Sequence, residues 1–426
     1  MEYKKLGDYC EVKGGKRLPK GDQLVEYETN HPYLRISDYS NGSVNLNNLK
    51  YVTEETFQKI SRYIINEGDI FLSIVGTIGI VDFIDYKLDS ASLTENAVRI
   101  RSFNESVLST KFLSYFLKSD QGQNEMFIRT VGSTQPKLAI TRIKDINIPI
   151  IDIKSQQKIS NILSTIDEKI TLNKNLIANL EELSQTLFKR WFVDFEFPDE
   201  NGDPYKSSGG EMVDSELGKI PKGWECVYLK DIVHHKKDTF NPKKSNESEV
   251  KHFSLPAFDS GQYPTIDNVT DIKSNKWIID ENCILFSKMN PTTRRIWVTS
   301  YNENFLNVAS SEFVVLKSDN SYRNAFIYNI CISDKFNEYL VSNTTGSTNS
   351  RQRVKPDIAV QYRFAYNEEV SYLLSEKIEP YIEKIKIIRE QNQNLTQLRD
   401  TLLPKLMSGE IEIPDDIEVM EDELSI

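Results

Sequence analysis

Two loops rich in glycine, serine and threonine recur in this chain. GSTQPKLAI begins at Gly132, and GSTNSRQRV begins 214 residues later at Gly346. Short hydroxyl and amide side chains donate hydrogen bonds to phosphate oxygens, Gln and Asn can read adenine edges, and Arg can read guanine. The loops are therefore either DNA contacts, which we favour, or purely structural turns. The candidate residues are Ser133, Thr134, Gln135 and Lys137 in the first loop, and Ser347, Thr348, Asn349, Arg351 and Arg353 in the second.

Two further basic stretches are weaker candidates for DNA contact. Gly14 and Gly15 lie between Lys13 and the pair Lys16-Arg17, so the backbone of this turn could approach a phosphate while its cations add charge-assisted hydrogen bonds. The other stretch lies in an irregular part of the second half, where Thr292 and Thr293 precede Arg294 and Arg295. Basic turns are common on protein surfaces, so neither pattern is specific by itself.

The residue patterns of catalysis are missing from the sequence. There is no GxxxxGK[ST] phosphate loop, no HExxH, and no glycine-rich methyl-donor loop followed by Asn-Pro-Pro or Asp-Pro-Pro. Asn290-Pro291 lacks the second proline and the aromatic residue of that tetrapeptide. The four cysteines and four histidines have no metal-ligand spacing. We therefore expect no cofactor, no metal and no catalytic residue.

The net charge of −11 is concentrated in two stretches. Residues 194–216 carry −7 and residues 410–426 carry −8, so the other 386 residues sum to +4. Local basic patches can therefore bind phosphate although the whole chain is acidic. The most apolar run, 70–81, is too short and too interrupted to span a bilayer, and the first residues lack the apolar core of a signal peptide. We expect a cytoplasmic protein.

Two long amphipathic helices must position these loops. Apolar residues recur every three or four positions from Ser155, which we expect to cap the first helix, to Trp191, and again from Asn367 to Met407. The two stretches superpose at an offset of 215 residues, which indicates a tandem repeat. We predict a mixed α/β domain at 1–153, a helix at 154–192, an acidic linker at 193–217, a second domain at 218–366, a helix at 367–409 and an acidic tail at 410–426.

A pseudo-twofold repeat predicts that the two helices pair antiparallel. If the numbers of facing residues sum to 565, Asn173 faces Asn392, and two amides in one layer can hydrogen-bond and fix the register. The same register has one flaw, because Ile166 would face Arg399. The predicted seam is Leu163, Ile170, Asn173, Ile177, Leu180 and Leu187 against Ile378, Ile385, Ile388, Asn392, Leu395 and Leu402.

The order of several short segments resembles that of a known family. These segments are GDI at 68–70, GSTQPKL at 132–138, INIPI at 146–150, QQKI at 156–159 and FKRWFVDFEFP at 188–198. The whole chain resembles the specificity subunit of type I restriction-modification systems. The second copy departs from the pattern, because its loop lacks the Pro and Leu of the first and no QQKI precedes its helix.

The resemblance implies a non-catalytic subunit with two target-recognition domains that each read half of a bipartite double-stranded DNA site. Its helices would be spacers that dock two methyltransferase subunits for adenine N6 methylation, and restriction/translocase subunits would join for cleavage. Two alternatives stay open from the residues alone: a self-contained methyltransferase or restriction enzyme with a divergent site, and a coiled-coil scaffold.

Overall fold

The computed structural model describes residues 2–40, 43–46, 49–132, 136–281, 283–301, 303–318, 323–346, 352–411 and 413. The chain divides into two compact units. The first comprises Met1–Ile170 with Leu395–Ile426, and the second is Thr171–Asn394. Within the described residues, no helix combines the length and the apolar character needed to cross a membrane.

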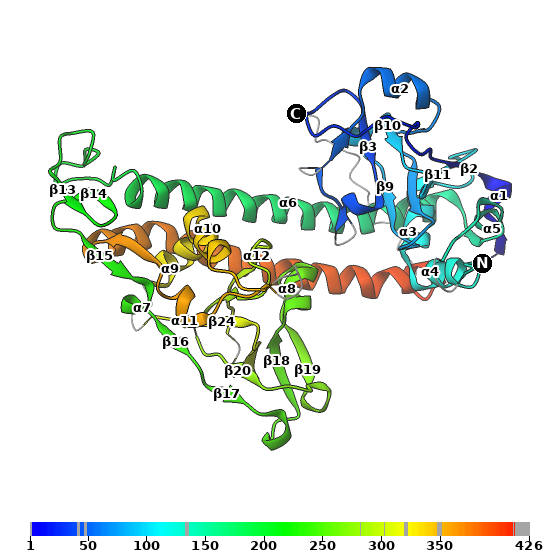
Figure 1. The fold of residues 1–426 in the computed structure, drawn as a ribbon. Helices are drawn as coiled ribbons and strands as arrows, with labels where there is room; N and C mark the ends of the chain where they lie inside the picture. Colours follow the sequence, from blue (N-terminus) through cyan, green and yellow to red (C-terminus); the bar gives the residue numbers. More distant parts are fainter. Residues whose placement is uncertain are drawn as a thin grey trace. The chain divides into compact units, whose positions relative to one another are not determined.

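The first unit is built around an antiparallel sheet with the strand order β2-β11-β8-β9, packed against helix α3 (Figure 1). A second sheet has the order β6-β3-β10-β7, and β1 pairs with β12. The bounds are β1 Glu2–Lys5, α1 Leu6–Tyr9, β2 Cys10–Gly14, β3 Pro32–Leu34, β4 Tyr39–Ser40, β5 Ser43–Val44, β6 Lys50–Tyr51, α2 Glu54–Ile60, β7 Ile64–Ile65, β8 Ile70–Ser73, β9 Val81–Phe83, β10 Ala91–Leu93, β11 Ala97–Ser102, α3 Thr110–Lys118, α4 Asp120–Phe127, α5 Ile140–Lys144 and β12 Asn147–Ile150.

The second unit repeats this topology. Its strand order β16-β24-β21-β22 corresponds to β2-β11-β8-β9, and β15 pairs with β25 as β1 pairs with β12. A five-stranded sheet, β17-β20-β23-β18-β19, replaces the second sheet. The bounds are β13 Met212–Ser215, β14 Gly218–Pro221, β15 Glu225–Tyr228, α7 Leu229–Ile232, β16 His234–Lys236, β17 Thr239–Phe240, β18 Glu249–Phe253, α8 Leu255–Gly261, β19 Thr265–Asn268, β20 Lys276–Ile278, β21 Ile284–Ser287, β22 Ile296–Val298, β23 Leu306–Ser310, β24 Phe313–Lys317, α9 Arg323–Ile332, α10 Asp334–Ser342, α11 Pro356–Ala359 and β25 Arg363–Tyr366. The predicted tandem repeat of mixed α/β units is confirmed.

The alternation of residue types along β11 explains the two faces of the first sheet. Val98 and Ile100 are buried and join a core with Phe112 of α3, whereas Arg99 and Arg101 project from the opposite face. Ser109 caps α3, because its hydroxyl accepts a hydrogen bond from the backbone N–H of Phe112. The sequence therefore places an apolar face toward the helix and a charged face away from it.

Helices α6 (Ile153–Phe192) and α12 (Glu368–Ser408) each contribute residues to both units. In the first unit, Leu163 shares a core with Leu403. In the second unit, Leu187 packs on the core that contains Ile378. From the start of α6 toward its end, the partner residues run from the end of α12 toward its start, so the antiparallel pairing is confirmed.

The predicted amide layer is present in the second unit. Asn173 Nδ2 donates a hydrogen bond of 2.8 Å to Asn392 Oδ1, and both residues are buried. Near the end of α12, the predicted seam residue Leu402 is half-buried against the core that contains Leu163, and its neighbour Leu403 is buried in that core. Arg399 does not face Ile166 unpaired, because its Nη1 donates to Asp167 at 2.9 Å.

Two local expectations are corrected. Asp152, and not Ser155, caps α6, because Asp152 Oδ1 accepts a hydrogen bond of 2.9 Å from the backbone N–H of Ser155. The segment 193–217, expected to be a linker, is folded: Phe197 is buried, and its ring lies 5.1 Å from that of Trp224. The aromatic residues of this segment bury enough apolar area to fold it, although its overall composition is acidic and rich in glycine.

Candidate nucleic-acid interface

Four loops meet beside the first sheet of the first unit. They follow β2, connect β8 to β9, connect β10 to β11, and follow α4. The backbone N–H of Gly15 donates to Ala97 at 3.0 Å, and that of Ile74 donates to Asn96 at 2.8 Å. Leu138 N–H donates to Ile74 at 2.9 Å, which ties the Gly-Ser-Thr loop to the same group. The predicted candidates Lys16, Arg17 and Lys137 thus come from loops joined by backbone hydrogen bonds, and Lys13 lies in β2 just before the first of these loops.

Gly15 has a specific role in this arrangement. A Cβ atom at this position would lie 2.1 Å from the carbonyl oxygen of Thr94, well inside van der Waals contact. At Gly14 the nearest atom would be the Ile140 Cδ1 at 3.5 Å, which is an ordinary contact. The close approach of two loops therefore requires glycine at Gly15 and not at Gly14.

Gly15→Ala should destabilise the first unit by about 1–3 kcal/mol, because the Thr94 backbone must move to admit the new methyl group. Gly14→Ala is the matched control and should change the free energy of unfolding by less than about 1 kcal/mol, because the added methyl group meets only an ordinary contact. Urea unfolding of the two variants gives the comparison. Equal effects in both variants would contradict the close-approach argument.

The second unit repeats these backbone contacts with different residues. Lys288 N–H donates to Glu312 at 3.0 Å, and Val354 N–H donates to Lys288 at 3.0 Å. Thr345 and Arg353 exchange two backbone hydrogen bonds of 2.9 Å, as Val131 and Lys137 exchange bonds of 3.0 and 2.8 Å. The two Gly-Ser-Thr loops therefore start and end in equivalent backbone positions.

In each unit, one residue with a left-handed backbone conformation donates a hydrogen bond to the Gly-Ser-Thr loop. Gly76 has φ 76° and Asn290 has φ 47°. The N–H of Gly76 donates to Pro136 and that of Asn290 to Gln352, at 3.3 and 2.9 Å. Asn tolerates positive φ better than most residues, so it can take the place of glycine here. This explains Asn290-Pro291 as a structural turn.

The basic side chains of the first unit lie close to carboxylates or rings. Lys13 Nζ is 2.7 Å from Glu11, and Arg17 Nε is 2.7 Å from Glu95. Lys16 Nζ lies 5.6 Å from the centre of the Tyr63 ring. Arg17 is nevertheless 82% exposed, and exposed pairs of this kind are weak enough for a phosphate to replace the carboxylate. Lys137 is also exposed and has no ion-pair partner within the described residues.

The predicted basic stretch of the second unit is mostly engaged within the protein. Thr292 and Thr293 close a turn on the side chain of Asn290, at 2.6 and 3.3 Å. Arg294 donates to Asp334 and to the carbonyl of Ile332, both at 2.8 Å. Arg295 makes two hydrogen bonds to Asp259, at 2.6 and 2.9 Å. The structure gives both arginines an internal partner, which the sequence did not indicate.

Several predicted contacts lie outside the residues that the structure describes. They are Ser133, Thr134 and Gln135 in the first loop, and Ser347, Thr348, Asn349 and Arg351 in the second. Arg353 lies just beyond this segment and is described. Its Nε and Nη2 donate to Glu312 at 3.2 and 3.4 Å.

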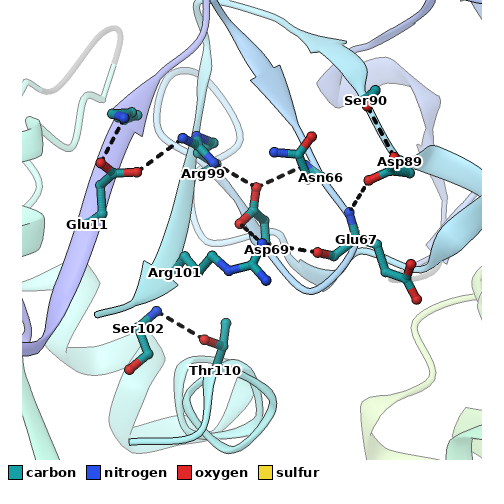
Figure 2. Close-up of polar contacts among 11 residues, drawn as sticks. Glu11, Asn66, Glu67, Asp69, Asp89, Ser90, Arg99, Arg101, Ser102 and Thr110 are labelled. Carbon is teal, nitrogen blue, oxygen red and sulfur yellow. Dashed lines mark hydrogen bonds and ion pairs between the residues drawn. The ribbon is translucent and has the colours of Figure 1, made fainter. Parts of the chain in front are cut away.

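A charge network that sequence reasoning missed covers the open face of the first sheet. Figure 2 shows Arg99 between Glu11 and Asp69, with Arg101 on the other side of Asp69. Arg99 lies 3.1 Å from Glu11 and 3.0 Å from Asp69, and Arg101 lies 3.3 Å from Asp69. The Asp69 side chain is fully buried and also accepts the backbone N–H of Asn66 at 2.9 Å. The alternation of apolar residues and arginines along 97–101 is a signal that could have located the arginine face, but it carries no information on the acidic partners.

The second unit has a corresponding cluster built from other residues. Asp280 accepts from Lys236 of β16 at 2.8 Å and lies 2.9 Å from Lys317 of β24. Burial alone would raise the pKa of Asp280, but the hydrogen bonds from the two lysines outweigh it and lower the pKa to about 2. Each unit thus places an aspartate between two cations, which both come from β11 in the first unit and come from β16 and β24 in the second. The cations are arginines in the first cluster and lysines in the second.

Comparison with known proteins agrees with this architecture. Residues 1–182 match the model of the type I restriction modification DNA specificity domain. Over 97% of its length, the chain is 26% identical to the type I restriction enzyme MjaIX specificity subunit of Methanocaldococcus jannaschii, and the match covers 94% of that protein. Residues 1–182 thus match the specificity-domain family, and almost the whole chain is similar to type I restriction-modification specificity subunits.

Two other relatives extend this assignment. The chain is 24% identical to the HindI specificity subunit of Haemophilus influenzae, over 82% of this chain and 87% of the other. It also shares its fold with the crystal structure of the S subunit from M. genitalium, with a TM-score of 0.57, 15% identity and 95% coverage of each chain.

Proposed function

We propose that this specificity subunit selects a bipartite site on double-stranded DNA, with each α/β unit reading one half. The observation that carries the proposal is the loop group that both units build with equivalent backbone hydrogen bonds and different side chains. The common backbone can place the loop group of each unit against its half-site in the same way. The side chains of the loops then determine which DNA bases are recognised. The described candidate contacts are Lys13, Lys16, Arg17, Lys137, Thr292, Thr293 and Arg353, with Arg294 and Arg295 supporting the second loop group.

The long helices would dock two methyltransferase subunits, which methylate adenine at N6 in the selected site. Leu172, Leu176 and Leu183 follow one stripe of α6 and are 61%, 40% and 55% exposed. A stripe of exposed leucines on a helix is typical of an interaction surface. In this proposal the specificity subunit itself performs no chemistry, and restriction/translocase subunits add DNA cleavage.

Exchanging residues 1–153 for the corresponding domain of another specificity subunit should change one half of the methylated motif. The reciprocal exchange of 218–366 is the matched control and should change the other half. Sequencing methylated adenines in cells that carry each hybrid and its methyltransferase subunits makes the comparison. If both halves changed together, or neither changed, independent reading by the two domains would be wrong.

A separate measurement distinguishes this proposal from a self-contained methyltransferase. The purified specificity subunit alone should show no calorimetric binding of S-adenosylmethionine, and its assembly with methyltransferase subunits should bind it. Binding by the isolated chain would favour the self-contained enzyme.

A further inference from the structure

Arg353 is held by its surroundings at both its backbone and its side chain. Its backbone pairs with Thr345, and its side chain makes two hydrogen bonds to Glu312. Glu312 is itself fixed, because its carbonyl accepts the backbone N–H of Lys288 at 3.0 Å. The orientation of the guanidinium is thus set by two separate loops, which lowers the entropy lost when it binds a ligand.

The pairing with Glu312 uses only one edge of the guanidinium. Nε and Nη2 face the carboxylate, so the terminal edge keeps the two hydrogens of Nη1 and the second hydrogen of Nη2. Nη2 also contacts the Met289 Sδ at 3.7 Å, but a thioether is a weak acceptor. The terminal edge is the part of an arginine that can make two parallel hydrogen bonds to O6 and N7 of guanine.

Exposure separates Arg353 from the other arginines near this loop group. The Arg353 side chain is 41% exposed, whereas that of Arg295 is 14% exposed and packed against Asp259. Both ends of the Arg294 guanidinium are occupied, one by Asp334 and one by a backbone carbonyl. Within the described residues of the loop group, Arg353 therefore combines a fixed orientation with an available terminal edge.

The first unit carries different residues at the equivalent positions. Lys137 takes the place of Arg353 in the backbone pairing. The carbonyl of Asn96 accepts the N–H of Ile74, as the carbonyl of Glu312 accepts that of Lys288. A lysine is a point charge on a flexible stem and lacks the planar fork of arginine. The two units therefore differ at one structural position in the property needed for guanine recognition.

We propose that Arg353 reads a guanine in the second half-site and that Glu312 is its positioning residue. This inference rests on the proposed function, and it adds the identity of one base and the residues that select it. Glu312 acts only through Arg353. Its carboxylate binds the Nε side of the guanidinium, so the terminal edge of the guanidinium points away from Glu312.

The test uses the full chain assembled with its methyltransferase subunits and a set of DNA duplexes. The first half-site is constant, and each base is placed in turn at each position of the second. Arg353→Ala should reduce discrimination in favour of guanine at one position by about 5- to 150-fold. Arg353→Lys should relax the same position while keeping the charge. Glu312→Ala should relax it partly, and Glu312→Asp should recover part of that loss.

Lys137→Ala is the matched control in the first unit. It should leave every base preference in the second half unchanged and reduce the salt dependence of binding by about one counterion. The inference is overturned if Arg353→Ala weakens binding to all duplexes equally, which is the behaviour of a phosphate contact, or leaves the preferences unchanged. Either result is compatible with a successful domain exchange, so failure of the inference is distinguishable from failure of the proposed function.

Discussion

Asp69→Ala should lower the free energy of unfolding of the first unit by about 3–5 kcal/mol, which is the usual cost of removing one partner from a buried ion pair. The Asp69 carboxylate has no solvent exposure and lies within 3.3 Å of two guanidinium groups. Without it, Arg99 and Arg101 repel each other, and Arg99, which is 17% exposed, cannot recover full hydration. Urea unfolding, with hydrogen exchange of β8 and β11 to assign the transition, measures the effect.

Glu28→Ala provides the control for this prediction, because Glu28 is an exposed acid of the same unit and should change stability by no more than about 0.5 kcal/mol. Arg99→Ala should cost more than Arg101→Ala, since Arg101 is 46% exposed and its loss is better compensated by water. A cost for Asp69→Ala below 1 kcal/mol would mean that water reaches this network and that the burial argument is wrong.

Asn173→Leu should destabilise the second unit by about 1–3 kcal/mol, because it leaves the amide of Asn392 buried without its partner. Replacing both residues by leucine should recover most of this loss, since two apolar groups can replace a buried hydrogen-bonded pair at little net cost. Urea unfolding of the single and double variants completes a double-mutant cycle. Asn175→Leu, at an exposed position two residues away, is the control.

A coupling energy near zero in this cycle would show that the two amides act independently. The double variant should also lose preference for one helix register, because apolar layers specify alignment less strongly than a paired amide layer. Cysteine cross-linking across the seam reports the register. A single cross-link pattern in the double variant would show that other residues set the alignment.

The two long helices could be predicted from the sequence, because the apolar repeat that indicates a helix is local and periodic. A 3.6-residue repeat specifies which residues face a partner, and the offset between copies specifies the partner, so the Asn173–Asn392 layer was predictable. The ion pair between Asp167 and Arg399 was not predictable, because its partners are 232 residues apart in sequence.

The loop residues were predictable as a group and not one by one. Recurrence of Gly-Ser-Thr located the equivalent positions in both units, but it could not show that Arg294 and Arg295 pair with Asp334 and Asp259. The same holds for Asp69, which meets Arg99 only through the pairing of β8 with β11. Cross-strand partners depend on the register of a sheet, and that register cannot be derived from a single sequence.

The sharing of α6 and α12 between the two units has a consequence for the order in which the chain folds during synthesis. Leu163 and Leu403 belong to the same core, so the first unit lacks part of its core until 240 further residues have followed Leu163. At a synthesis rate of about 5–20 residues per second, this takes roughly 12–48 s. The second unit comprises Thr171–Asn394, so all of its residues emerge before Leu403 does. The unit that comes second in the sequence is therefore the first that can complete its core.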